Sequence, residues 1–336
     1  MKIKLPHRNR GRQSAEAERK YQSEIATFCA AILQIDSGLD FKVSSRGWCY
    51  ILEEHGLTKG DFDAAQRLIN ECRKSGDLPL DICAVDEGRS TECLESINPN
   101  SPEEEAEGWV EHVREHAQYG YTPASFWEGL NDYVEMTVEK IDLVGLFKPI
   151  CNELHVPLTN VAGWNDINTR AAIMKRFKYW ESQGKRCVLL HCGDHDPGGL
   201  HISDFLHSNF ADLTGAVGWS PDDLKIDRFG LNADFIRRHR LTWIDNLETS
   251  SGGRLDDPRH PDHLKPYVQS YLRRFGARKV EANALVVRAQ AGRALCRQAI
   301  LKYVPEDAPA EYEARLAPLR EEMQQHIIRL LAEAAE

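Results

Sequence analysis

The 336-residue chain carries two aspartates shortly after an apolar run near its middle. Residues 186–191 predict a buried strand, and Asp194 and Asp196 follow it. Because alternate residues of an extended chain point the same way, the two carboxylates repel each other at close range. A hard divalent cation relieves this repulsion, and Mg²⁺ prefers oxygen ligands of this kind. The pair therefore predicts a magnesium site.

A third carboxylate is expected at the same place. Residues 133–138 predict a second strand, which is followed by Glu139 and Lys140. The carboxyl ends of parallel strands meet at one edge of a sheet, so we expect Glu139 beside Asp194 and Asp196. Mg²⁺ binds one or two protein carboxylates and completes its shell with water and the phosphate oxygens of a substrate. The three acids therefore indicate chemistry on a phosphate group.

The aspartate pair alone is not specific for magnesium. The pattern Asp-x-Asp also occurs in calcium loops, phosphatases, glycosyltransferases and ordinary turns. An EF-hand is disfavoured because Gly198 and Phe205 stand where that loop needs an oxygen ligand and a glutamate. Pro197 stops the strand instead, and the glycines after it allow the turn that begins a helix. The acids are thus expected at a strand-to-helix switch.

The order of these motifs resembles a Toprim domain. Glu139 followed by Gly-Asp-His-Asp-Pro-Gly-Gly at 193–199 is similar to the Toprim acid motifs, and the form Asp-x-Asp-Pro-x-Gly resembles the family of the topoisomerase VI A subunit and the meiotic double-strand-break protein. Residues 45–52 and 73–79 resemble the winged-helix half of that family. The similarity continues, more loosely, in three later stretches: 229–232, 271–276 and 280–285.

This resemblance implies an activity and the residues that perform it. In the family a winged-helix tyrosine cleaves DNA, and the matching residue here is Tyr50. Arg46 stands one helical turn before it on the same face, where a guanidinium can hold the scissile phosphate. The family implies a homodimer that cuts both strands of double-stranded DNA. Three features depart from its pattern: Cys49 replaces the first of two tyrosines, Gly47 replaces a larger polar residue, and residues 163–166 are an imperfect match to the Gly-containing segment between the two Toprim motifs.

Further basic residues are expected to contact the DNA backbone, where phosphate attracts positive charge. They are Lys140 and His195 beside the acids, Arg73 in the winged-helix half, and Arg237 and Arg238 in a later basic region. The chain has no Gly-rich phosphate loop, so ATP-driven strand passage would need a separate ATPase partner.

The alternation of strands and helices after residue 131 predicts an α/β fold with a parallel sheet. The resemblance places an N-terminal, mostly helical winged-helix domain before this sheet and a helical C-terminal extension after it. Five regions follow: a basic arm and N-terminal helix at 1–35, the tyrosine-bearing winged-helix DNA-binding domain at 36–97, an acidic linker with a helix at 98–130, the metal-binding Toprim domain with its extension at 131–305, and an amphipathic helix at 306–336.

Composition and charge limit the classes of function. The formal net charge of −10 argues against indiscriminate DNA binding, although affinity for phosphate follows local charge, and the first twelve residues form a basic arm that includes Arg10 and Arg12. No segment is apolar for long enough to span a membrane, and the start of the chain lacks the apolar core of a secretion signal. The nine cysteines form no Cys-x-x-Cys pair and are expected to be reduced thiols. We therefore expect a cytoplasmic, nucleoid-associated protein.

Three functions remain open. The first is a DNA topoisomerase-like transesterase, an isomerase in which Tyr50 attacks the phosphodiester while Glu139, Asp194 and Asp196 hold Mg²⁺. The second is a Toprim nuclease that hydrolyses DNA with metal-activated water and keeps Tyr50 in its core. The third is an inactive DNA-binding protein of the same fold. Convergence of the three acids at one edge of the sheet is the observation on which the two enzyme hypotheses depend.

Overall fold

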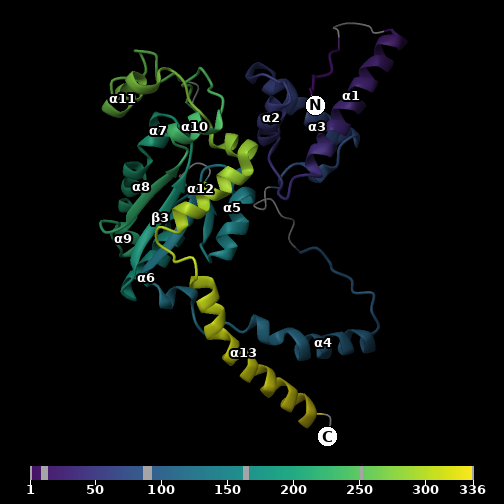
Figure 1. Ribbon diagram of the computed structural model, residues 1–336, viewed down its shortest axis with the longest axis vertical. Helices are drawn as coiled ribbons and strands as arrows, with labels where there is room; N and C mark the ends of the chain where they lie inside the picture. Colours follow the sequence, from purple (N-terminus) through teal and green to yellow (C-terminus); the bar gives the residue numbers. More distant parts are fainter. Residues whose placement is uncertain (1, 9–13, 86–92, 162–165, 250–252, 335–336) are drawn as a thin grey trace.

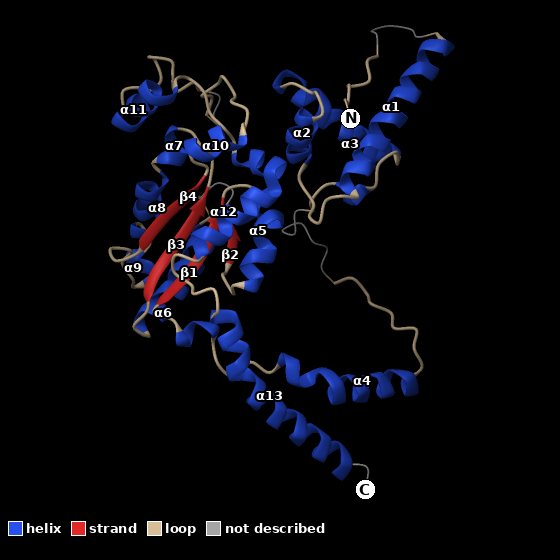
Figure 2. Cartoon of the chain, viewed as in Figure 1, coloured by secondary structure: helices blue, strands red, loops and turns tan. Residues whose placement is uncertain are grey.

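The centre of the protein is a four-stranded parallel sheet (Figures 1 and 2). The structure is a computed structural model that describes residues 2–8, 14–85, 93–161, 166–249 and 253–334, so Arg10 and Arg12 of the expected basic arm lie outside the described residues. The strands lie in the order β2-β1-β3-β4: β1 is Asp132–Val138, β2 is Leu158–Asn160, β3 is Arg186–Cys192 and β4 is Lys225–Gly230. The predicted α/β class with a parallel sheet is confirmed, and β4 is a strand that the sequence analysis missed.

Helices cover both faces of this sheet, as a parallel sheet requires (Figure 2). One face carries α5 (Ile141–Glu153) and α12 (Ala289–Ile300), and the other carries α6 (Ile167–Ser182), α8 (Ile202–Ala211) and the short α9 (Thr214–Val217). Strand β1 is buried on both sides. Its Met136 sulfur lies 3.9 Å from the Sγ atoms of Cys151 and Cys296, while Tyr133 stacks on Trp180 of α6.

Short helices follow β3 and β4. The predicted strand-to-helix switch is present, and two helices follow β3 in turn, the one-turn α7 (Pro197–Leu200) and then α8. Helices α10 (Ala233–His239) and α11 (Pro266–Phe275) lie beyond the carboxyl ends of the strands, and a 3₁₀ segment, η6 (Ala282–Arg288), leads into α12 (Figure 1). The segment 249–263, which is rich in Gly, Pro, Asp and Ser, contains no helix or strand in its described part.

The N-terminal region is helical where the sequence predicted helices. It consists of α1 (Ala15–Asp36), α2 (Ser45–Glu54) and α3 (Phe62–Ser75), with 3₁₀ segments η1 (Lys59–Asp61) and η2 (Leu80–Ile82). Trp48, Tyr50 and Phe62 are buried between these helices. In place of a wing, the described residues up to 85 contain η2 and a single parallel bridge between Val43 and Cys83, but no strand. A helical domain is therefore confirmed, whereas its winged-helix identity stays a prediction.

A buried carboxylate joins this helical domain to the sheet domain. The side chain of Asp142, on α5, accepts hydrogen bonds from the backbone N–H and the hydroxyl of Ser44 and from the amide of Asn283. Gly47 allows α2 to approach, because a Cβ at that position would lie 2.9 Å from Asp142 Oδ1. The departure from the family pattern at Gly47 thus has a packing reason in this chain. Nearer the surface, Arg293 makes a second link to Asp40.

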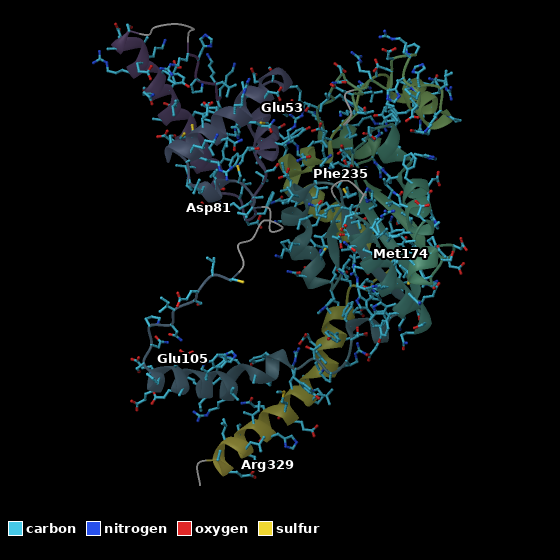
Figure 3. All side chains as sticks on the ribbon, turned by 180° about the vertical axis from the view of Figure 1, so that it is seen from behind. Glu53, Asp81, Glu105, Met174, Phe235 and Arg329 are labelled. Atoms are coloured by element: carbon cyan, nitrogen blue, oxygen red, sulfur yellow. The ribbon has the colours of Figure 1, made fainter. Side chains whose placement is uncertain are left out.

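Two helices form an arm that extends away from the sheet domain. They are α4 (Pro102–His116), which the short η4 (Ala117–Gly120) follows, and α13 (Ala308–Glu333), which passes through Pro318 without a break. The start of α13 is anchored, because Tyr312 and Leu316 are buried near η5 (Phe126–Gly129). Figure 3 shows Glu105 and Arg329, on the two helices of the arm, at a distance from Met174 in the sheet domain. The helix expected within the linker at 98–130 is therefore present as α4, and the helix expected at 306–336 is present as α13.

Replacing Asp142 by alanine is expected to destabilise the protein by about 2–4 kcal/mol, because two partly buried donors of Ser44 and the buried amide of Asn283 lose their acceptor. The matched control is Asp40→Ala, which removes the exposed carboxylate at the same junction, where an ion pair contributes about 0–1 kcal/mol. Urea unfolding followed by circular dichroism measures both changes. Equal, small losses in the two variants would show that Asp142 does not hold the domains together.

Candidate metal and phosphate site

The structure brings two of the three expected acids together at the ends of adjacent strands. Val138 at the end of β1 pairs with Cys192 at the end of β3, so the residues that follow each strand are neighbours. The backbone N–H of Asp194 donates a hydrogen bond to Glu139 Oε2 at 3.1 Å. The expected meeting of these acids thus follows from the parallel pairing of their strands.

A lysine ammonium lies between the two carboxylates. Lys140 Nζ is 2.6 Å from Glu139 Oε1 and 3.1 Å from Asp194 Oδ2. Burial alone would lower the pKa of Lys140, but the two carboxylates raise it above its usual value. The other oxygen of Asp194 accepts the backbone N–H of Ala282 at 2.7 Å. The Lys140 ammonium therefore lies between two of the carboxylates that were expected to bind Mg²⁺.

Asp196 is held by the turn that follows β3. Its Oδ1 accepts the backbone N–H of Gly199 at 2.6 Å, which caps α7. The turn is tight, because a Cβ at Gly199 would lie 2.0 Å from the carbonyl oxygen of Asp194. Burial raises the pKa of Asp196, and the charge of Glu139 adds to this effect. Asp196 is thus close enough for the charge of Glu139 to affect its pKa, although one of its oxygens already accepts a backbone hydrogen bond.

The acid cluster carries more negative charge than its surroundings compensate. Asp194 is 7% exposed, and burial together with the charge of Glu139 raises its pKa to about 7, against the opposing effect of Lys140. Burial would also raise the pKa of Glu139, but Lys140 outweighs it and leaves that pKa lowered. Asp194 is therefore partly protonated around neutral pH. A bound cation would favour the ionised carboxylate and so lower this pKa.

The donor set fits Mg²⁺ in its chemistry, but the side chains are not arranged around a cation site. Within the described parts of the chain, no group of three or more His, Cys, Asp or Glu residues stands in a position to hold a metal ion. The contacts explain this finding, since Lys140 bridges Glu139 and Asp194 while Asp196 caps a turn. Binding of a divalent cation would require Lys140 to leave its place between the two carboxylates.

Tyr50 is buried close to this cluster. Its side chain is 1% exposed, its ring packs edge-on against Phe62 at 5.1 Å, and Lys59 Nζ lies 3.9 Å from the ring centroid. The phenol O–H donates to Glu281 Oε2 at 2.7 Å. Burial and the charge of Glu281 raise the pKa of Tyr50 far above its usual value. In this arrangement the phenol is protonated and shielded from solvent.

Glu281 is the site residue that the sequence analysis missed. It accepts the Tyr50 hydroxyl and lies 3.4 Å from Arg46 NH2, and both contacts lower its pKa against the effect of burial. The next residue, Ala282, binds Asp194 through its N–H. Glu281 thus connects the expected nucleophile to the acid cluster within one chain. The only signal for it was its position in the stretch 280–285, which contributed to the family resemblance as a whole.

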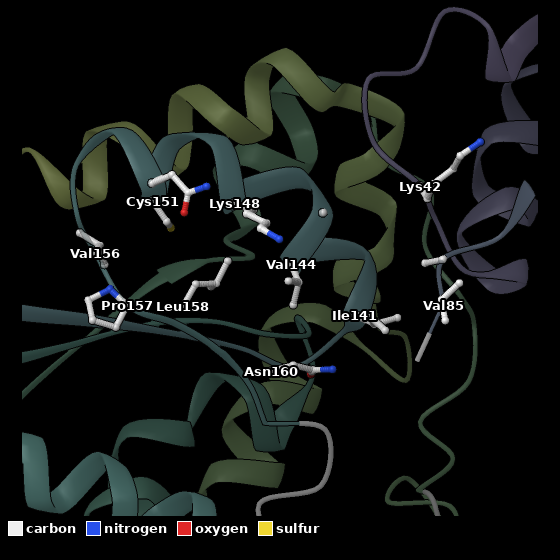
Figure 4. A pocket seen from close by; sticks show the side chains of 13 residues that line it. Lys42, Val85, Ile141, Val144, Lys148, Cys151, Val156, Pro157, Leu158 and Asn160 are labelled. Atoms are coloured by element: carbon white, nitrogen blue, oxygen red, sulfur yellow. The ribbon is translucent and has the colours of Figure 1, made fainter. Parts of the chain in front are cut away.

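The two halves of the site share one cavity of about 540 Å³. Its walls come from the segment before and within α2, from the end of β1 and from η6: Ser44, Arg46, Ala84, Glu139, Lys140, Ile141, Asn160, Glu281 and Asn283. A second cavity of about 740 Å³ adjoins it and shares Ala84, Ile141 and Asn160 (Figure 4). Lys42 and Lys148 line this second cavity, which follows the open edge of β2. Together the cavities form a groove that carries three lysines.

The other expected DNA contacts are spread over the molecule. His195 is buried among Trp243, Tyr271 and Phe275, and burial lowers its pKa to about 4, so it is neutral around pH 7. Contact between His195 and DNA would require this aromatic cluster to open.

The expected arginine contacts lie nearer the surface than His195 does. Arg73 is half-buried on α3 and donates to the carbonyl oxygen of Leu80. Arg237 and Arg238 are exposed on α10, where Arg237 pairs with Asp234. None of the three arginines lines the groove.

Comparison with known proteins identifies no relative: no family model, curated protein or solved structure matches this chain. Among the described helices, none combines the length and apolar character needed to cross a membrane. The site must therefore be interpreted from its own geometry.

Replacing Lys140 by methionine is expected to strengthen Mn²⁺ binding on the order of tenfold, because the competing ammonium is removed and the carboxylates are left uncompensated. Electron paramagnetic resonance of free Mn²⁺, titrated with protein in the absence of DNA, measures this affinity. Lys148→Met is the matched control, since Lys148 lines the adjoining cavity and makes no ion pair with these acids. An unchanged Mn²⁺ affinity in Lys140→Met would contradict competition between lysine and metal.

Proposed function

We propose that this chain is a DNA-cleaving transesterase similar to the A subunit of topoisomerase VI. The observation that carries the proposal is the shared cavity, where Arg46 and Glu281, both in contact with Tyr50, face Glu139 and Lys140 at the end of β1. A nucleophile, cationic side chains and a carboxylate cluster are the parts that attack on a phosphodiester requires.

The chemistry follows from the charge of the phosphodiester. Tyr50 Oη forms a bond to phosphorus, the bond from phosphorus to one DNA oxygen breaks, and that oxygen takes up the proton that the phenol releases. The Glu281 carboxylate, 2.7 Å from the phenol, is placed to accept the tyrosine proton. Arg46 can hold the phosphate oxygens, and Mg²⁺ bound by Glu139, Asp194 and Asp196 would offset the charge that grows on them. A phosphotyrosyl bond keeps the cleavage reversible.

The arrangement described above is a closed one. Tyr50 is buried against η6, so α2 must separate from η6 before a phosphate can reach the phenol. The groove with Lys42, Lys140 and Lys148 offers positive charge along which a DNA strand can approach. Double-stranded DNA is the proposed substrate, a second copy of the chain would supply the second cut, and a separate ATPase partner would be needed for strand passage.

A metal-dependent nuclease is the second candidate. The burial of Tyr50 and its raised pKa favour it, since both make the phenol a poor nucleophile in the closed arrangement. In that case Tyr50 is a packing residue, and water activated at the acid cluster would attack the phosphate. An inactive DNA-binding protein of this fold is the third.

Covalent capture tests the first candidate against the others. Purified protein is incubated with end-labelled supercoiled DNA and Mg²⁺, stopped with detergent, and the label that remains attached to protein is measured. Tyr50→Phe is expected to reduce capture by a factor on the order of 10³ or more, because the attacking oxygen is gone. Tyr133→Phe is the matched control: it removes another buried phenol that donates to a glutamate, Glu135, and should leave capture intact.

The acid cluster provides the second arm of this experiment. Asp194→Asn is expected to abolish both cutting and capture if either enzyme hypothesis holds. Free DNA ends that persist in Tyr50→Phe would reject the transesterase and support hydrolysis. The absence of any cutting with Mg²⁺ or Mn²⁺ would reject both enzymes and leave the DNA-binding protein.

A further inference from the structure

The arm formed by α4 and the second half of α13 carries many of the large hydrophobic side chains that are exposed to solvent. Of the seventeen large hydrophobic side chains exposed in the described chain, eight lie on this arm or directly after α4: Trp109, Val110, Val113, Tyr119, Tyr121, Leu319, Ile328 and Leu330. Trp109 is the most prominent of those within a helix, with 62% of its surface exposed. Clustered exposure of this kind marks an interaction surface more often than a solvated face.

Helix α4 depends on packing that this chain does not provide. It has 15 residues and none of them is buried. An isolated helix of this length is only marginally stable in water. Helix α13 supports one side, where Gln324 donates to the carbonyl oxygen of Arg114. The apolar stripe of Ala106, Trp109, Val110 and Val113 remains open to solvent.

The charges of α4 are arranged for pairing with an identical helix. Its first two turns carry Glu103, Glu104, Glu105 and Glu107, whereas its one arginine, Arg114, stands in the last two turns, together with Glu111, Glu115 and the histidines His112 and His116. At about 100° per residue, Glu103, Glu107 and Arg114 lie on one flank of the apolar stripe. A groove of about 420 Å³ runs along this flank and includes Glu107, Val110 and Arg114.

An antiparallel copy centred between Trp109 and Val110 completes this pattern. In that alignment Arg114 of the second copy falls opposite Glu103 and Glu107, and the reverse holds by symmetry. On the other flank, Glu105 falls opposite the two histidines. Glu104 and Glu115 point away from the contact, whereas Glu111 lines the same groove as Glu107 and Arg114.

We infer that this arm is a homodimer interface, in which two copies of α4 pack antiparallel with their tryptophans at the centre. The two α4 helices and two α13 helices then form a four-helix arrangement about a two-fold axis. The inference deepens the proposed function, because a cut in both strands of DNA needs two copies of the site.

The position of the arm suits this role. Helix α13 is anchored beside η5, just before the start of β1, whereas Glu139 follows the end of β1. The arm and the acid cluster thus lie at opposite ends of β1, and Figure 1 shows α13 leaving the sheet domain at the end away from α10 and α11. Contact between two arms leaves both grooves accessible to DNA.

Sedimentation equilibrium of the full chain, without DNA or metal, tests the inference. The wild type is expected to be a dimer, and Trp109→Asp is expected to raise the dimer dissociation constant at least a hundredfold, because a charge replaces the central aromatic contact. Tyr179→Asp is the matched control, since Tyr179 is a similarly exposed aromatic side chain on α6 and its replacement should leave the dimer intact.

Charge exchange tests the alignment itself. Arg114→Glu is expected to weaken the dimer about tenfold or more, because it places glutamate opposite glutamate. Adding Glu103→Arg and Glu107→Arg to that variant restores complementarity and should recover the dimer. A monomeric wild type at about 100 µM protein, or a triple variant no tighter than Arg114→Glu, would overturn the inference. A dimer that fails to capture DNA would reject the proposed function alone, and capture by a monomer would reject the interface alone.

Discussion

The contact on which the site depends is a lysine ammonium between two buried carboxylates. Parallel pairing of β1 and β3 brings Glu139 and Asp194 together, and burial increases the free energy of repulsion between the two ionised carboxylates. Lys140, at 2.6 and 3.1 Å, compensates them in the closed arrangement. A divalent cation could do the same with a higher charge and with positions left for phosphate oxygens. In this arrangement Lys140 therefore provides the positive charge that we propose Mg²⁺ would provide during catalysis.

The same contact links the two halves of the molecule. Asp194 accepts the N–H of Ala282, and the preceding residue, Glu281, accepts the hydroxyl of Tyr50. Movement of the acids on metal binding would thus reach η6 directly and, through Glu281, the packing of α2. This gives a physical route by which metal and DNA could open the closed arrangement, although Asp142 holds α5 to the residues around Ser44 on the other side of the cavity.

The sequence predicted the parts that follow simple periodicity and could not predict those that depend on distant contacts. Strands β1 and β3 are continuous apolar runs, so their pairing and the meeting of Glu139 and Asp194 could be expected. Strand β4 was missed because Asp227 and Arg228 break its pattern and are satisfied by Tyr303, Lys302 and nearby carbonyl groups. The role of Glu281 depends on Tyr50, which is far away in the sequence, and the role of Lys140 depends on Asp194, which follows β3. The exposure of α4 could not be foreseen either, since its amphipathic pattern gives no indication of what covers it.

We propose that the carboxylates around Lys140 form a divalent-cation site. Crystals grown in Mn²⁺ with a short DNA duplex, and measured at a wavelength where manganese scatters anomalously, test it directly. We expect one anomalous peak bounded by Glu139, Asp194 and Asp196, with Lys140 turned away from the two carboxylates that it now bridges. Density that keeps the ammonium between Glu139 and Asp194, with no anomalous peak at millimolar Mn²⁺, would contradict it.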